Sequence, residues 1–216
     1  MSTRTRVWLC GTLRLEIDDR EVTVTGQAQC LLGYLLANGP VDRADLIDLL
    51  WPDRPPRDPH AALRPILSRL RRALAPARIE GRERVHLVLP EPVWVDVEEA
   101  MHAAPADALA LIGSGFLPCC HADWARERRE QIEELRLRAL ERVGGEAAAR
   151  ELVARAPYRE SGYRLLMEAL AAEGNVAEAL RVYERLRCLL RDDLGIFPAP
   201  HLMALHRRLV EPRLAA

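Results

Sequence analysis

Apolar residues in the first part of the chain alternate with polar ones, a pattern that is typical of strands. Residues 7–11 and 13–17 predict two short strands, and the second of them alternates apolar and polar residues. Residues 18–20 are Asp-Asp-Arg, which favours a turn, and a third strand is expected to start at residues 22–24. The chain is therefore expected to begin with a small β-sheet.

The pattern then changes to apolar residues at every third or fourth position, which indicates helices. A cluster of leucines predicts a helix over residues 27–38, and the Asn-Gly-Pro that follows its last apolar residue ends it. A second helix is expected to begin at Asp42 or Asp45 and to end near Leu50. Proline residues then connect it to a third predicted helix.

The third predicted helix covers residues 59–74 and has a single apolar stripe. Asp58 is expected to cap it by accepting from free backbone N–H groups, and Pro59 suits the first helical position, where no donor is needed. Pro65 lies inside the helix and removes one backbone hydrogen bond, so we expect it to kink or loosen the first turns. The stripe consists of Leu63, Ile66, Leu67, Leu70 and Leu74.

The rest of this helix carries arginines and one serine. Because the apolar stripe must be buried, these side chains are held pointing outward together, as reading a DNA groove requires. An ordinary surface helix with a solvated basic face is the alternative interpretation. The candidate DNA contacts on the helix are Arg64, Ser68, Arg69, Arg71 and Arg72.

Residues 78–89 predict a β-hairpin with a charged tip and an apolar return strand. Arg82 and Arg84 lie at the tip and are further candidates for DNA contact. Strands, three helices and such a hairpin together make a winged helix-turn-helix. In that arrangement the third helix enters the major groove, and the hairpin reaches the flanking backbone or the minor groove.

The second part of the chain predicts helices almost throughout, over residues 124–143, 146–155, 161–173, 176–190 and 198–210. Gly144 and Ala149 are echoed thirty residues later by Gly174 and Ala179. Small residues at helix crossings let paired helices pack closely, as in tetratricopeptide-type repeats. The fold class is therefore mainly α with a small β component.

Charge narrows the class of partner. The formal net charge is −1, so the total gives no signal for nucleic acid or membrane. Residues 54–84, however, hold nine arginines against three acids, whereas residues 96–216 hold 17 arginines against 20 acids. One basic region on an otherwise neutral protein indicates a local anionic partner. The chain has no lysine, which we interpret as codon bias.

The sequence gives weaker signals for the cellular compartment and for metal-binding or catalytic chemistry. The five cysteines are an odd number, so we expect a reducing cytoplasm, and no apolar run approaches the length of a membrane span. Cys119, Cys120, His121 and Asp123 offer metal-type ligands, but no second pair stands at zinc-site spacing, so we expect no metal. We find no glycine-rich phosphate loop and no catalytic set, and expect neither a cofactor nor enzyme activity.

At the level of whole motifs, residues 7–96 resemble the response-regulator type of winged helix. The closest likeness is to the Streptomyces antibiotic regulatory protein (SARP) family of transcriptional activators. This resemblance implies that residues 59–74 contact base edges and phosphates. It is carried by residues 9–11, 29–36, 41–52, 67–74 and 94–96, and the Leu-Trp-Pro of 50–52 followed by the Ser-Arg-Leu-Arg-Arg of 68–72 is its most specific pair.

Residues 97–216 resemble the bacterial transcriptional activation domain, through Gly115–Pro118, Pro157–Glu160, Leu166–Leu170 and Asp193–Gly195. The predicted domains are therefore a winged helix-turn-helix over 1–96 and a tetratricopeptide-like helical domain over 97–216. The resemblance implies a homodimer that binds promoter repeats in double-stranded DNA and contacts RNA polymerase. One departure is the segment between Asp96 and Gly113, which is short for the family and is expected to lack a helix.

Other functions fit the same residues. A tetratricopeptide-type adaptor would use its helical repeats to bind a protein, with the winged helix as a structural module. A repressor or a sensor with a small ligand in the helical domain would have the same architecture. Steep salt dependence of binding would favour the DNA-binding regulator, because phosphate contacts release counterions.

Overall fold

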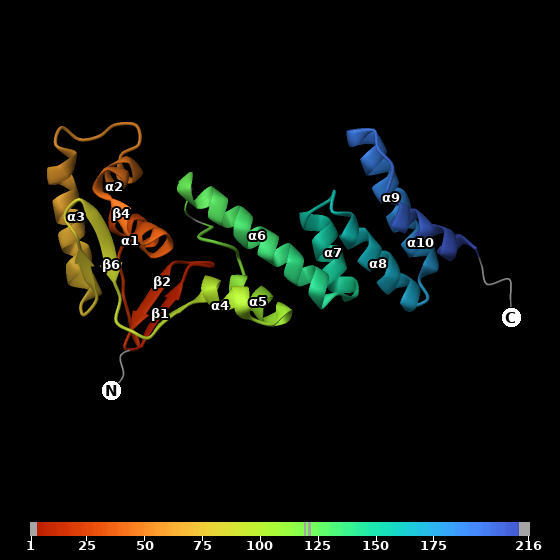
Figure 1. Cartoon of the computed structure of the whole chain (residues 1–216), viewed down its shortest axis with the longest axis horizontal. Coiled ribbons are helices and arrows are strands. Elements are labelled where there is room, and N and C mark those ends of the chain that lie inside the picture. The colour runs from red at the N-terminus through yellow and green to blue at the C-terminus, as the bar shows by residue number, and fades with distance from the viewer. Residues whose placement is uncertain (1–3, 119, 121, 212–216) are drawn as a thin grey trace. The chain divides into compact units, whose positions relative to one another are not determined.

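The computed structural model describes residues 4–118, 120 and 122–211 (Figure 1). The chain divides into two compact units, and each is described by itself. Unit 1 comprises residues 1–103 and 110–132, and unit 2 comprises residues 104–109 and 133–216. Helices dominate both, which confirms the prediction of a mainly α protein with a small β component.

Unit 1 contains a sheet made of β1 (Thr5–Trp8), β2 (Arg14–Ile17), β3 (Arg20–Glu21) and β7 (Val93–Val95), in the order β3-β2-β1-β7. The pairs β1–β2 and β2–β3 are antiparallel, and β1–β7 is parallel. Asp18 and Asp19 both have positive φ, at 52° and 59°, and this two-residue turn places Arg20 opposite Ile17. The third strand therefore lies at residues 20–21, and the predicted residues 22–24 are not in a strand.

A second sheet in unit 1 consists of β4 (Val41–Asp42), β5 (Arg78–Glu80) and β6 (Arg84–Val88), in the order β4-β6-β5. Three helices accompany it, α1 (Gln27–Asn38), α2 (Arg43–Leu50) and α3 (Pro59–Leu74). All three helices and the β5–β6 hairpin lie where the apolar pattern predicted them. The helices pack against one another, and leucines of each, such as Leu31, Leu46 and Leu70, are fully buried.

The segment that was expected to lack a helix forms two, α4 (Asp96–His102) and α5 (Pro105–Ile112). That prediction was wrong. Asp96 is buried and accepts hydrogen bonds from the backbone N–H groups of Leu9, Cys10 and Val97, at 2.8–3.0 Å. It thereby joins the first turn of α4 to the end of β1, and the acidic first turn also favours the helix dipole.

Unit 2 is helical in its described residues. Helix α6 (Trp124–Val143) contributes its residues after Ile132 to this unit. Then come α7 (Gly145–Arg155), α8 (Glu160–Ala172), α9 (Val176–Leu194) and α10 (Pro200–Val210). Helix α9 runs one turn beyond the predicted residue 190 and ends at Gly195, whose left-handed conformation lets the next N–H groups bond back to the last turn.

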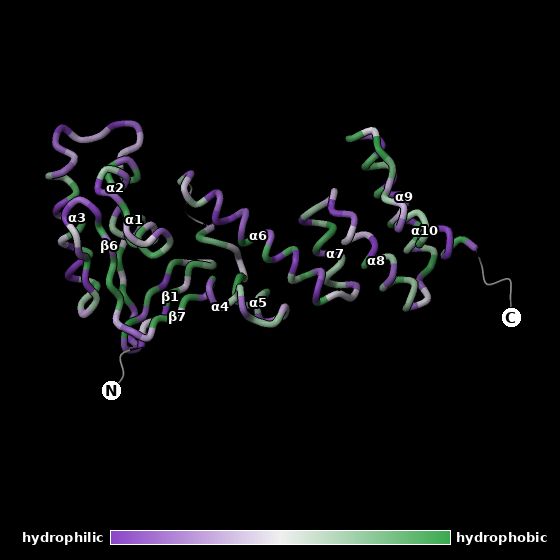
Figure 2. Tube along the Cα trace, viewed as in Figure 1, coloured by the Kyte–Doolittle hydropathy of each residue, from purple (hydrophilic) through white to green (hydrophobic). Residues whose placement is uncertain are grey.

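Consecutive helices of unit 2 pack as pairs, α7 with α8 and α8 with α9. Ala149 and Ala179, the small residues of the predicted repeat, are fully buried in this core. At Gly162 a Cβ atom would stand 3.1 Å from Leu152 and 3.2 Å from Val153, so the glycine permits the close approach of α7 and α8. Figure 2 shows hydrophobic residues alternating with hydrophilic ones along these helices.

Candidate nucleic-acid interface

Helix α3 is fixed in unit 1 by its start and by its apolar stripe. Asp58 Oδ1 accepts a 2.9 Å hydrogen bond from the N–H of Ala61, which confirms the predicted cap. The helix continues without interruption through Pro65. All five residues of the stripe are buried, and α3 packs against α1, α2 and β5. Its opposite face is thereby held toward solvent.

That solvent-facing side of α3 carries positive charge with no neutralising partner. At 100° per residue, Arg64, Ser68 and Arg72 follow one another along the helix at four-residue spacing, and Arg69 lies beside them. All four side chains are exposed. Within the described residues, none of these three arginines forms a salt bridge or a side-chain hydrogen bond.

Arg71 differs from the other arginines of α3. It is exposed, but its Nε donates a 3.3 Å hydrogen bond to the backbone carbonyl of Ile79 in β5. The side chain therefore joins the helix to the hairpin. This contact depends on tertiary structure, so the pattern of residues along the helix gave no sign of it. A role for Arg71 in DNA contact stays a prediction.

The β5–β6 hairpin has a turn that requires glycine at Gly81. Its φ is 92°, and a Cβ atom there would stand 1.8 Å from the carbonyl oxygen of Arg84. The tip is held against the start of α2, because the Arg43 N–H donates to the Glu83 carbonyl at 2.8 Å. This contact fixes where the hairpin presents Arg82.

Arg82 and Arg84 are both exposed, as predicted for the hairpin tip. Arg84 Nη2 lies 3.5 Å from the carbonyl oxygen of Pro40, a long contact that directs this side chain back toward the body of unit 1. Arg82 forms no salt bridge within the described residues. Of the two, Arg82 is the side chain left to meet an external anion.

Two further arginines were missed as candidates. Arg54 and Arg57 lie in the loop that leads into α3, and both are exposed. No salt bridge involves either of them in the part of the chain that the structure describes. Their signal was present in the sequence, because both belong to the basic stretch 54–84. With Arg64, Arg69, Arg72 and Arg82 they make six unpaired guanidinium groups, which we call the arginine surface.

Arginines of unit 2 behave differently. Most pair with a carboxylate on the same helix, as Arg138 with Glu134 and Arg150 with Glu146, each at 2.7 Å. In unit 1 two acids near α3 are occupied elsewhere: Asp58 caps the helix, and Glu80 pairs with Arg78 at 3.4 Å. The arginine surface is therefore a local excess of positive charge, and an anionic partner with repeated charges would neutralise it.

The described residues give no support for a metal site or for a membrane-spanning helix. Cys119 and His121 of the metal-type group lie outside them, and no group of three or more histidine, cysteine or acidic side chains within them could hold a metal. Across the same residues, no helix combines the length and the apolar composition that crossing a bilayer requires.

The bacterial transcriptional activator domain family matches residues 95–210 of the chain. The chain belongs to this family. Its activator domain thus begins at the end of β7 and covers the described helices α4 to α10. The match confirms the predicted resemblance to the bacterial transcriptional activation domain.

Curated relatives also match the N-terminal part of the chain, which the family match does not cover. Regulatory protein AfsR of Streptomyces coelicolor is 33% identical over 237 residues, with 91% of this chain and 24% of AfsR covered. Transcriptional regulator RedD of the same organism is 31% identical, with 86% and 64% covered. The chain thus spans less than two thirds of the length of either relative. The SARP-type resemblance predicted from the sequence is confirmed.

A solved structure shares the fold. Mycobacterium tuberculosis EmbR in complex with a low affinity phosphopeptide superposes with a TM-score of 0.72. The sequence identity is 24%, and the match covers 97% of this activator-domain protein and 65% of the EmbR chain. At this identity the likeness concerns the fold alone, which agrees with the mainly helical class.

Proposed function

We propose that this chain is a transcriptional regulator that binds double-stranded DNA in a sequence-specific way and activates transcription. The observation that carries the proposal is the arginine surface, six exposed guanidinium groups without acidic partners on and around α3. The names of AfsR and RedD as regulators support it. In this proposal α1, α2, α3 and the β5–β6 hairpin act as a winged helix-turn-helix.

The proposed contacts follow from the chemistry of each side chain. On α3, Arg64, Arg69 and Arg72 offer planar forks that match guanine O6 and N7 in the major groove, or phosphate oxygens. Ser68 stands among them and its hydroxyl donates or accepts. Arg82 on the hairpin reaches the flanking backbone or minor groove. Arg54 and Arg57, before the helix, contact phosphates.

Substitutions on α3 test these contacts directly. Arg69→Ala and Arg72→Ala should each weaken binding to a specific DNA site by about 1–3 kcal/mol if they meet bases, or lower the salt dependence by about one ion if they meet phosphate. Fluorescence anisotropy at several salt concentrations measures both quantities.

The matched control is Arg150→Ala, which removes the same charge from an ion pair in unit 2. DNA affinity should be unchanged in this variant. If Arg69→Ala and Arg72→Ala bind as tightly as the Arg150→Ala protein, α3 is not the DNA-contacting helix. Binding that is weak and insensitive to salt would favour the protein-binding adaptor.

We also propose that the protein acts as a homodimer on promoter repeats and contacts RNA polymerase. Three exposed apolar residues lie at and just after the end of α9 in unit 2: Leu194, Ile196 and Phe197, whose exposed fractions are 53%, 48% and 76%. Exposed apolar side chains that lie together mark protein contacts. We assign this surface to the second copy of the chain, whereas the polymerase contact rests on membership of the activator-domain family.

Phe197→Ser tests the dimer. It should shift sedimentation of the DNA complex from two copies to one copy per repeat pair, because the largest exposed apolar side chain is lost. Val143→Ser changes another exposed apolar residue of unit 2, 46% exposed, and serves as the control. Two copies on DNA for the Phe197→Ser protein would exclude this surface as the dimer contact.

A further inference from the structure

Unit 1 contains a cavity that the proposed DNA contacts do not use. Its volume is about 410 Å³, within the range of small-molecule sites. Three segments surround it: the turn after β1, one face of α1, and the chain that leads into α6. Glycines at 11, 26 and 33 leave space where side chains would otherwise stand.

The buried and half-buried side chains of the lining are mainly apolar. Leu117 is buried, and Leu13, Cys30, Cys120 and Trp124 are half-buried. Thr12 and Gln29, the lining side chains that carry a hydroxyl and an amide, are exposed. No charged side chain occurs among the described residues that line the cavity. A charged ligand would therefore lose its hydration without gaining a partner.

The Cys30 thiol acts as apolar surface in this cavity. Burial raises the pKa of the Cys30 thiol, and the neighbouring Cys120 adds to the effect. Cys30 is thus protonated at neutral pH and is a poor nucleophile. A protonated thiol is a small, polarisable, weakly polar group that packs well against aromatic rings. The cavity accordingly favours a ligand held without a covalent bond.

Trp124 gives the cavity an aromatic wall. Its ring meets the rings of Tyr34 and Phe116 edge to face, with centroids 5.1 and 6.1 Å away. Its Nε1 is buried and is not exposed to the cavity, so the tryptophan offers a ligand apolar ring surface.

We propose that this cavity binds a neutral, largely aromatic small molecule. The indole ring and the apolar walls favour the aromatic body, and the absence of charge along the described lining favours neutrality. The site is separate from the arginine surface and adds ligand binding to the proposed function. Helix α1 lines the cavity and also packs against α3.

The dye prodan, a neutral naphthyl ketone, is the probe for this site. Its fluorescence should rise and shift to the blue on titration with the full chain, with saturation at one equivalent. Bound dye should slow the reaction of Cys30 with N-ethylmaleimide, followed by mass spectrometry, by about fivefold or more. Cys188 on α9 is the internal control in the same sample and should react at an unchanged rate.

Cys30→Phe fills the cavity and should weaken dye binding by about tenfold or more. Cys188→Phe makes the same change in unit 2 and should bind dye like the native chain. Absence of saturable binding would overturn the proposal. So would equal protection of Cys30 and Cys188 in the native chain, a result that does not depend on the folding of any variant. Neither readout requires DNA, so the outcome is independent of the proposed function.

Discussion

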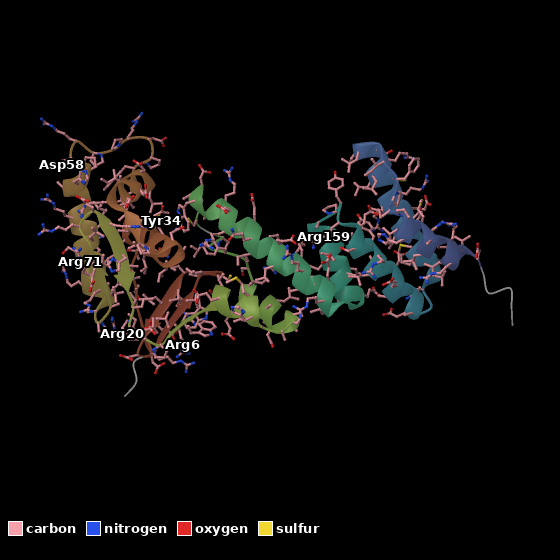
Figure 3. The ribbon with its side chains drawn as sticks, viewed as in Figure 1. Arg6, Arg20, Tyr34, Asp58, Arg71 and Arg159 are labelled. Carbon is pink, nitrogen blue, oxygen red and sulfur yellow. The ribbon has the colours of Figure 1, made fainter. Side chains whose placement is uncertain are left out.

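Arg159 holds together the start of unit 2, and removing one of its partners should have a measurable cost. Its Nε lies 2.8 Å from Glu141 Oε1, and its Nη2 lies 3.1 Å from Glu141 Oε2, a two-pronged pair. Nη1 lies 2.8 Å from Glu134 Oε2, and the hydroxyl of Ser161 also donates to Glu141. The network joins α6 to the beginning of α8 (Figure 3).

The substitution Glu141→Gln keeps the shape of this side chain and removes its charge. Hydrogen bonds to charged groups contribute about 1.5–3 kcal/mol, whereas exposed ion pairs contribute about 0.2–1 kcal/mol. Arg159 and Glu141 are 26% and 25% exposed, and Arg159 keeps Glu134 in the variant. We therefore expect a loss of about 1–2 kcal/mol in the free energy of unfolding, or about 5–10 °C for a domain of this size.

The loss should depend on pH in a defined direction. Hydrogen bonds from Arg159 lower the pKa of Glu141 below its ordinary value of 4.5. A carboxylate with a lowered folded-state pKa contributes stability above its unfolded pKa, and the contribution disappears as pH falls through the folded pKa. The difference between wild type and Glu141→Gln should be full at neutral pH and should shrink below about pH 4.5.

Thermal unfolding followed by far-ultraviolet circular dichroism measures this difference. Glu168→Gln is the control, because Glu168 pairs with Arg164 at 2.7 Å on one helix and both side chains are more than a third exposed. That variant should lose about 0.5 kcal/mol or less. Equal losses for Glu141→Gln and Glu168→Gln, or a difference that grows in acid, would refute the reasoning.

Two further substitutions test the elements that carry the arginine surface. Asp58→Ala should cost about 1 kcal/mol of stability because it removes the cap on the Ala61 N–H, whereas Asp58→Asn should cost less; equal melting temperatures for the two variants would contradict the capping role. Gly81→Ala should distort the hairpin, since a Cβ would meet the Arg84 carbonyl, and should weaken DNA binding without changing the helical circular dichroism; unchanged DNA affinity would show that the hairpin makes no contact.

Much of the fold was predictable because its signals are local. The stripe on α3, the Asp58 cap and the leucines of α1 each determine an element by their own spacing, and the structure places them as predicted. Helices α4 and α5 were missed because their support is tertiary. Asp96 stabilises the first turn of α4 by accepting from Leu9 and Cys10, far away in the sequence.

The charge pattern predicted where the candidate site lies in the chain, but not which of its arginines already have a partner in the folded protein. The basic stretch identified the arginines of α3 and the hairpin from charge alone. Charge does not show which guanidinium groups are already engaged, as Arg71 is with the Ile79 carbonyl. Charge alone also did not single out Arg54 and Arg57 as candidates. Their exposure and their lack of acidic partners are visible only in the folded unit.

The most direct test of the proposed function is fluorescence anisotropy of the purified chain against tiled fragments of its own upstream DNA. It should be carried out at two salt concentrations with random-sequence competitor. We predict that one fragment binds in the presence of competitor and that higher salt weakens this binding steeply, as release of phosphate counterions requires. Absence of binding at both salt concentrations would contradict the proposal and would favour the protein-binding adaptor.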